Sequence, residues 1–206
     1  LAMPAHCMRF WPAWVWMKDR LLEGTFGQPL KASFHRTGAA PGWNQSFYLD
    51  DTQSGGALVD LHIHDVDFIV HAFGMPSTVS STGSRRHVNT SYTFSDSASE
   101  VTAEGGWLEE DAPFNMRCTI ECEEGTMDFD LSRDIEMQVH QHGAIIEHPE
   151  ASEGGSGYDG EVSAIIRAIQ SAEKTPPVTL EDASKVARVL LGEIESLDQG
   201  RSVTVS

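Results

Sequence analysis

The chain has 206 residues, of which 40% are hydrophobic, and a formal net charge of −17. This length suits one domain with a sizeable core, or one domain and a fragment of another. The acidic charge, without a basic patch, argues against a nucleic-acid or anionic-membrane partner, because phosphate binding needs clustered Lys and Arg. No apolar run reaches the ~20 residues that a membrane span needs.

Three cysteines leave one unpaired in any disulfide scheme, and no cationic and apolar leader precedes them. We therefore expect a reduced, cytoplasmic protein. The abrupt and already apolar start at Leu1 suggests that an N-terminal part is missing.

The first third of the chain contains segments with helical spacing of apolar residues and segments in which apolar residues alternate as in a strand. Residues 12–23 have apolar side chains at helical spacing, with Pro12 suited to a first turn. Alternating apolar residues over 30–34 predict a strand, and 37–54 is expected to be a loop. Residues 55–73 carry a helical apolar stripe that ends at Gly74, so we expect one helix there.

From residue 76 to 149 the pattern changes to alternation and predicts about six strands with short connections, which favours an antiparallel sheet. Residues 150–157 form an acidic, Gly-rich loop. Two amphipathic helices follow, the second with an N-cap pattern from Thr179 to Asp182. The whole chain predicts an α+β fold, with helices packed on one face of a large open, predominantly antiparallel sheet.

The residues best suited to chemistry lie directly after Gly55-Gly56. In a helix, Asp60 and His64 are one turn apart on one face, either as a surface pair or as a proton-transferring pair. In a strand, His62 and His64 point the same way and resemble metal ligands. The two conformations therefore predict different enzymes.

The metal hypothesis rests on Asp60-x-His62-x-His64, which resembles the first-strand motif of amidohydrolases. The flanking sequence is helical, and the chain does not alternate strand and helix as a TIM barrel requires. The metallo-β-lactamase pattern fails as well, because Val66 stands where that motif needs Asp. We expect no metal, and keep a metal-dependent amidohydrolase-like enzyme as the lesser alternative.

Residues 54–67 are similar to a Gly-Gly-x-x-x-Asp-x-x-x-His signature, and Met-Arg-Phe-Trp-Pro at 8–12 precedes them. Together with Gly106-Trp107, Gly125-Thr126-Met127 and the tail 158–206, they resemble the C-terminal domain of the glucose–fructose oxidoreductase / inositol dehydrogenase family (Gfo/Idh/MocA). The resemblance implies a dihydrodipicolinate-reductase-like C-terminal fold. Residues 1–12 would be the end of a missing nucleotide-binding domain or a connecting strand, and 13–206 the substrate-binding and oligomerisation domain.

The same resemblance implies hydride transfer between NAD or NADP and a secondary alcohol of a sugar, cyclitol or related polyol. His64 would be the general base, with a pKa near the working pH, and would indicate the inositol-dehydrogenase-like branch. Asp60 would hold the imidazole ring or bind a neighbouring hydroxyl. The chain has no G-x-G-x-x-G turn between a strand and a helix of a βαβ unit, so the absent domain would bind most of the cofactor and the fragment alone would be inactive.

Four further residues are substrate-binding candidates. Arg9 either reaches a substrate group or pairs with an acid, and His62 is either packed or at the substrate rim. Trp43 and Asn44 lie in the loop before the motif and are expected to contact substrate. The alternative function is a non-catalytic binding or oligomerisation module, because in this family the outer sheet face commonly pairs subunits as a homodimer or homotetramer.

Overall fold

The computed structural model describes residues 1–97, 99–173 and 175–205. Its strands are β1 Pro29–Ala39, β2 Thr78–Ser84, β3 His87–Thr93, β4 Glu100–Leu108, β5 Asn115–Cys122, β6 Gly125–Asp130, β7 Met137–Gln141, β8 Ala144–Glu147 and β9 Val203–Thr204. Its α-helices are α1 Pro12–Glu23, α2 Gln45–Tyr48, α3 Asp51–Ser54, α4 Gly56–Asp60, α5 Ile63–Phe73, α6 Gly157–Gln170 and α7 Leu180–Gln199. Its 3₁₀ turns are η1 Cys7–Phe10, η2 Gly42–Asn44 and η3 Pro149–Ser152.

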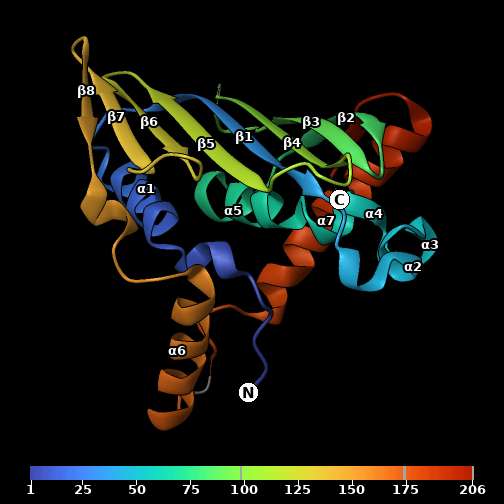
Figure 1. Ribbon diagram of the computed structural model, residues 1–206. Coiled ribbons are helices and arrows are strands. Elements are labelled where there is room, and N and C mark those ends of the chain that lie inside the picture. Colours follow the sequence, from blue (N-terminus) through green and yellow to red (C-terminus); the bar gives the residue numbers. More distant parts are fainter. Residues whose placement is uncertain (98, 174, 206) are drawn as a thin grey trace.

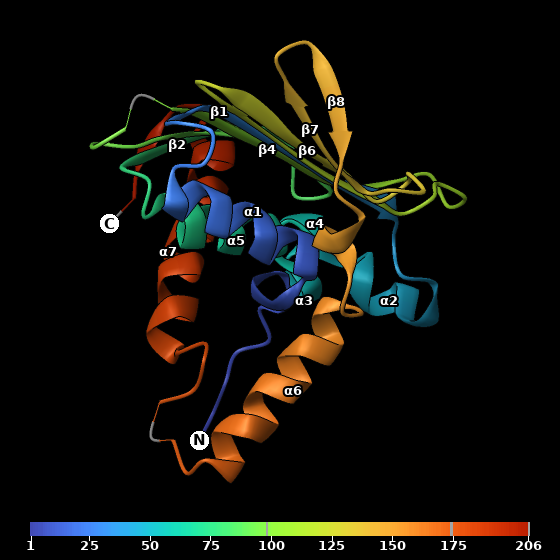
Figure 2. The ribbon, with the colours of Figure 1, turned by 90° about the vertical axis from the view of Figure 1, so that its left-hand side faces the viewer.

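These strands form one sheet in the order β8-β7-β6-β5-β1-β4-β3-β2-β9. Strand β1 runs parallel to β4, and the other neighbouring pairs are antiparallel. Helices α1, α4, α5 and α7 lie along one face of the sheet, and the opposite face stays open (Figures 1 and 2). The predicted α+β fold with an open, predominantly antiparallel sheet is therefore confirmed.

The core lies between the sheet and this helical layer. In β5, Met116, Cys118 and Ile120 are buried while the residues between them are more exposed, as the alternation of a strand dictates. On the helical side, Trp14 of α1 meets Phe68 of α5 edge-to-face, with ring centroids 4.7 Å apart. Burying side chains of this size contributes about 1.5–3 kcal/mol each, so α1 and α5 are held firmly against the sheet.

Several predicted elements agree with the structure. Helix α1 covers the predicted residues 12–23. Helix α7 begins with the predicted cap, because the Thr179 side chain accepts from the backbone N–H of Asp182 and the Asp182 carboxylate accepts from the backbone N–H of Thr179. This reciprocal capping satisfies two backbone donors that a helix start otherwise leaves open.

Other expectations were wrong in part. The stretch 37–54 is not simply a loop, because β1 continues to Ala39 and the short elements η2, α2 and α3 follow. Residues 1–12 contain no connecting strand. The second half of this segment holds η1 and the first residue of α1. Within the described ranges, no helix is both long and apolar enough to cross a membrane.

Candidate active site

The helix predicted around the Asp60–His64 motif is broken into α4 and α5 by a turn at Leu61 and His62. The carbonyl oxygen of Ala57 accepts from the N–H of Leu61 at 2.9 Å and from the N–H of His62 at 2.8 Å. The second bond spans five residues instead of four, as in the π-bulges that often occur at functional sites. The break puts Asp60 at the end of α4 and His64 in the first turn of α5, so the two residues do not lie on one continuous helix.

His64 lies in the first turn of α5, with its Nδ1 3.7 Å from Sγ of Cys7. Burial, with the Arg36 guanidinium nearby, lowers the pKa of His64 to about 4. The imidazole is therefore neutral at pH 7 and able to accept a proton. Burial raises the pKa of Asp60, which ends α4.

These observations correct two expectations about the pair. The pKa of His64 is well below the working pH instead of near it. Within the described part of the chain, no hydrogen bond or ion pair joins Asp60 to His64, so Asp60 does not hold the ring. Binding of a neighbouring substrate hydroxyl by Asp60 stays a prediction.

A buried ion pair lies directly behind His64. The Arg36 guanidinium donates to Asp65 through Nε at 3.1 Å and Nη2 at 2.8 Å, and both side chains are buried. Sequence reasoning missed this pair, although Arg36 alternates with Ala32 and Phe34 along one strand face. That register was the available signal, because it places Arg36 among core residues.

Arg9 forms a second buried pair. Its Nε and Nη2 donate to the Asp67 carboxylate of α5 at 2.7–3.1 Å, and its Nη1 lies 3.4 Å from Asp182 of α7. Burial raises the pKa of Asp67, and the bonds from Arg9 oppose that shift. Of the two alternatives for Arg9, the structure has the pairing with an acid, and contact of Arg9 with substrate stays a prediction.

His62 belongs to the core and not to a substrate rim. Its side chain is 0% exposed, and its Nε2 lies 3.1 Å from the Tyr92 hydroxyl and 3.3 Å from Oε2 of Glu193. The Tyr92 hydroxyl donates to Oε1 of Glu193 at 2.7 Å. Burial alone would lower the pKa of His62, but the Glu193 carboxylate outweighs it and the pKa is raised. The substrate-binding prediction for His62 is therefore wrong, and the packing alternative holds.

Trp43 and Asn44 lie on η2, and both are exposed, Trp43 to 80%. The Trp43 ring packs edge-to-face on Tyr48, with centroids 5.6 Å apart, and Tyr48 packs in the same way on Trp107. No hydrogen bond between described residues links Trp43 or Asn44 to Asp60 or His64. Their contact with substrate stays a prediction.

The strand geometry that the metal hypothesis needs is absent from this segment, because α4 and α5 replace it and His62 faces the core. Across residues 1–97, 99–173 and 175–205, no group of three or more His, Cys, Asp or Glu side chains is arranged to hold a metal ion. The amidohydrolase-like alternative therefore loses its structural basis.

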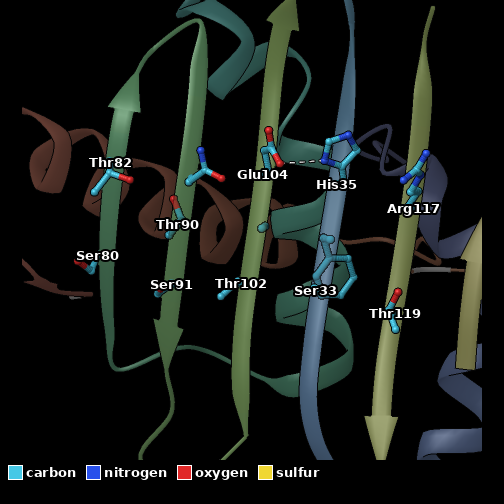
Figure 3. Close-up of a pocket in the computed structure, with 13 residues that line it drawn as sticks. Ser33, His35, Ser80, Thr82, Thr90, Ser91, Thr102, Glu104, Arg117 and Thr119 are labelled. Atoms are coloured by element: carbon cyan, nitrogen blue, oxygen red, sulfur yellow. Dashed lines mark hydrogen bonds and ion pairs between the residues drawn. The ribbon is translucent and has the colours of Figure 1, made fainter. Parts of the chain in front are cut away.

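A hollow lies away from this motif, on the open face of the sheet (Figure 3). It measures about 570 Å³, and polar side chains from neighbouring strands line it. Glu104, which lines it, binds Nδ1 of His35 at 2.9 Å and, outside the lining, Nε2 of His87 at 2.7 Å through its carboxylate. The helical layer lies behind the sheet in this view, so the hollow and His64 are on opposite sides.

The comparisons identify the family. The sequence profile of the GFO/IDH/MocA C-terminal domain matches residues 14–128, which is more than half of the chain. The chain belongs to this family. The GFO/IDH/MocA match spans α1 to most of β6 and includes both Asp60 and His64. No curated protein matches the chain.

Solved structures share the GFO/IDH/MocA C-terminal fold. Levoglucosan dehydrogenase in complex with NADH and levoglucosan has a TM-score of 0.81 and 20% identity, over 98% of this chain and 65% of that one. The aldose-aldose oxidoreductase of Caulobacter crescentus, with glycerol, has a TM-score of 0.82 and 17% identity, over 98% and 63%. An oxidoreductase of Agrobacterium radiobacter in complex with NAD+, L-tartaric acid and magnesium has a TM-score of 0.73 and 15% identity, over 98% of this chain and 64% of that one. The chain thus spans less than two thirds of each.

Proposed function

We propose that this chain is the substrate-side domain of an NAD(P)-dependent oxidoreductase that acts on a secondary alcohol of a sugar, cyclitol or related polyol. The observation that carries the proposal is the neutral His64 imidazole at the break between α4 and α5, within the segment matched to the GFO/IDH/MocA C-terminal domain. Structural neighbours crystallised with levoglucosan or glycerol support the polyol class.

In this proposal His64 accepts the proton of the substrate hydroxyl while hydride leaves the same carbon. A neutral imidazole is the form that such a base needs, and the lowered pKa keeps His64 in that form at pH 7. Asp60 would accept a hydrogen bond from an adjacent substrate hydroxyl, because its carboxylate makes no hydrogen bond with His64 among the described residues. Trp43 and Asn44 would reach the substrate from η2.

The chain's own residues do not fit a whole dinucleotide. Gly24 and Gly27 follow helix α1, while Gly154 and Gly155 follow η3, and neither pair stands between a strand and a helix in a βαβ unit. We therefore assign NAD or NADP to a nucleotide-binding domain that precedes this one, and expect the isolated fragment to be inactive. The neighbours that carry NADH or NAD+ are longer proteins, because this chain covers only 65% and 64% of their lengths.

Residues 1–12 would be the end of that preceding domain, and 13–206 the C-terminal domain. The surface of α6 supports a longer protein, because Val162, Ile166 and Ile169 are exposed on a helix that projects beside the N-terminus (Figure 2). Exposed apolar patches of this kind are usually covered in the complete assembly. The buried, unpaired cysteines suit the cytoplasmic placement that we propose.

A second candidate function is oligomerisation through the open sheet face. This face is the broad uncovered surface of the fold, and its hollow is lined by hydrogen-bonding side chains (Figure 3). A homodimer or homotetramer through it is compatible with catalysis in the parent protein, since His64 lies on the opposite side of the sheet.

Two measurements test the catalytic proposal. The coding DNA upstream of Leu1 should encode a strand, a Gly-x-Gly-x-x-Gly turn and a helix. In that parent protein, His64→Ala should lower kcat about 10²- to 10⁴-fold. The matched control is His71→Ala, which removes another histidine of α5 whose pKa burial also lowers to about 4. Near wild-type turnover of His64→Ala would remove His64 from the mechanism.

A further inference from the structure

We propose that Cys7 is the positioning residue of His64, holding its imidazole at Nδ1 in the place that the Asp60 carboxylate was expected to fill. This inference rests on the proposed role of His64 and deepens it. Sγ of Cys7 lies 3.7 Å from Nδ1 of His64, within the range of a hydrogen bond to sulfur. The described residues contain no such contact between Asp60 and His64.

Two neighbouring helices fix the position of Cys7. Turn η1 is clamped to α5, because Arg9 donates to Asp67 three times at 2.7–3.1 Å. Helix α6 begins so close to η1 that a Cβ on Gly157 would lie 2.5 Å from the carbonyl oxygen of Cys7. Cys7 itself is buried at 3% exposure. A thiol held this firmly restrains the ring that it contacts.

The positions of the protons on the Cys7 thiol and the His64 imidazole decide which ring nitrogen of His64 can act as a base. Burial raises the pKa of the Cys7 thiol to about 11 and lowers the pKa of His64 to about 4, so both groups are neutral at pH 7. If the thiol donates to Nδ1, the imidazole proton sits on Nε2, which then has no lone pair to offer. If Nδ1–H donates to sulfur, the Nε2 lone pair is free to accept the substrate proton.

The second arrangement is the one that the proposed role of His64 requires. Tyr158, at the start of α6, lies beside the thiol, and Cys7, after burial, contributes to a raised pKa of its hydroxyl. The phenol therefore stays protonated at pH 7 and can donate to the same sulfur that accepts from Nδ1 of His64. When Nε2 takes the substrate proton, Nδ1–H continues to donate to sulfur, so no proton has to cross Cys7.

The test reads the tautomer of His64 directly, by two-bond ¹H–¹⁵N correlation NMR on the 206-residue chain at pH 7, with His64→Gln to assign its signals. We expect the Nδ1–H tautomer in the wild type and in Asp60→Asn. Cys7→Ala should lower the ratio of Nδ1–H to Nε2–H about fivefold, the effect of losing one ordinary hydrogen bond. The matched control Cys118→Ala removes a buried thiol from β5 and should change nothing.

Cys7→Ser keeps a hydroxyl acceptor in nearly the same volume, so it should fold, keep the Nδ1–H tautomer and move the Nδ1 resonance. A dominant Nε2–H tautomer in the wild type would overturn the inference. So would an unchanged Nδ1 resonance in Cys7→Ser, or an Asp60→Asn variant that shifts the tautomer ratio.

These outcomes are independent of hydride transfer, so the proposed function can fail while the tautomer result stands. In the parent protein, a positioning role predicts that Cys7→Ala lowers kcat with little change in KM and that Cys7→Ser restores part of it.

Discussion

Arg36 of β1 donates to Asp65 of α5 through two nitrogens, at 3.1 and 2.8 Å, in the interior between sheet and helices. The pair joins the central strand to the helix that carries His64. The same guanidinium contributes to the lowered pKa of that histidine. One ion pair therefore links the stability of the fold to the charge state of the candidate base.

Removing one partner of this pair should be costly. Asp65→Ala leaves the Arg36 charge buried and unpaired, and we expect it to lower the free energy of unfolding by about 3–5 kcal/mol in urea titration. The control Asp51→Ala breaks the exposed pair with Arg86 and should cost about 0–1 kcal/mol. Equal losses for the two variants would contradict the prediction.

The space beside His62 should not accept a methyl group. A Cβ on Gly105 of β4 would lie 2.6 Å from the Cβ of His62, which the bonds to Tyr92 and Glu193 prevent from moving freely. We expect Gly105→Ala to destabilise the chain by about 1–3 kcal/mol, measured by thermal or urea unfolding. Gly42→Ala is the control, because open space surrounds that position, and its effect should stay within about 0.5 kcal/mol.

Stability should rise with pH between about 4 and 6.5. The pKa values of His64 and His71 are both about 4 in the fold, below the usual 6.5, so the unfolded chain binds more protons in this window. Their contribution is complete above pH 6.5 and is lost as pH falls toward 4. Urea midpoints at pH 5 and 7 measure the slope.

The double variant His64→Gln/His71→Gln should flatten that slope, whereas His142→Gln, which removes a histidine at an exposed turn, should leave it intact. His62 acts in the opposite sense, because its pKa is raised and its stabilising effect fades as pH rises past 6.5. An unchanged slope in the double variant would refute the assignment to these two residues.

Association through the open sheet face should be sensitive to charge at its centre. Ser91→Arg and Thr102→Arg place long cations in the hollow of Figure 3, and we expect either to convert the proposed oligomer to a monomer, as measured by light scattering. Ser163→Arg, on the exposed side of α6, is the control and should leave the assembly unchanged. A monomeric wild-type chain at high concentration would rule out this interface.

Much of the fold was predictable because it follows from local spacing. Helix α1, the capping box at Thr179 and the alternating strands all depend on residues close in the chain, and the structure confirms them. The break at Leu61 and His62 was not predictable in this way. It depends on the Ala57 carbonyl, which accepts hydrogen bonds from two backbone N–H groups. It also depends on the contacts of His62 with Tyr92 and Glu193, which lie far along the sequence.

The sequence by itself determined the α+β class, the family resemblance and the choice of His64, because these rest on periodicity and on one compact motif. Only the tertiary structure decided the partners of the motif. In it, Cys7 contacts His64, Arg9 pairs with Asp67, and His62 is buried in the core. The physical reason is that a side chain's partner depends on which elements pack together, and burial then sets its charge.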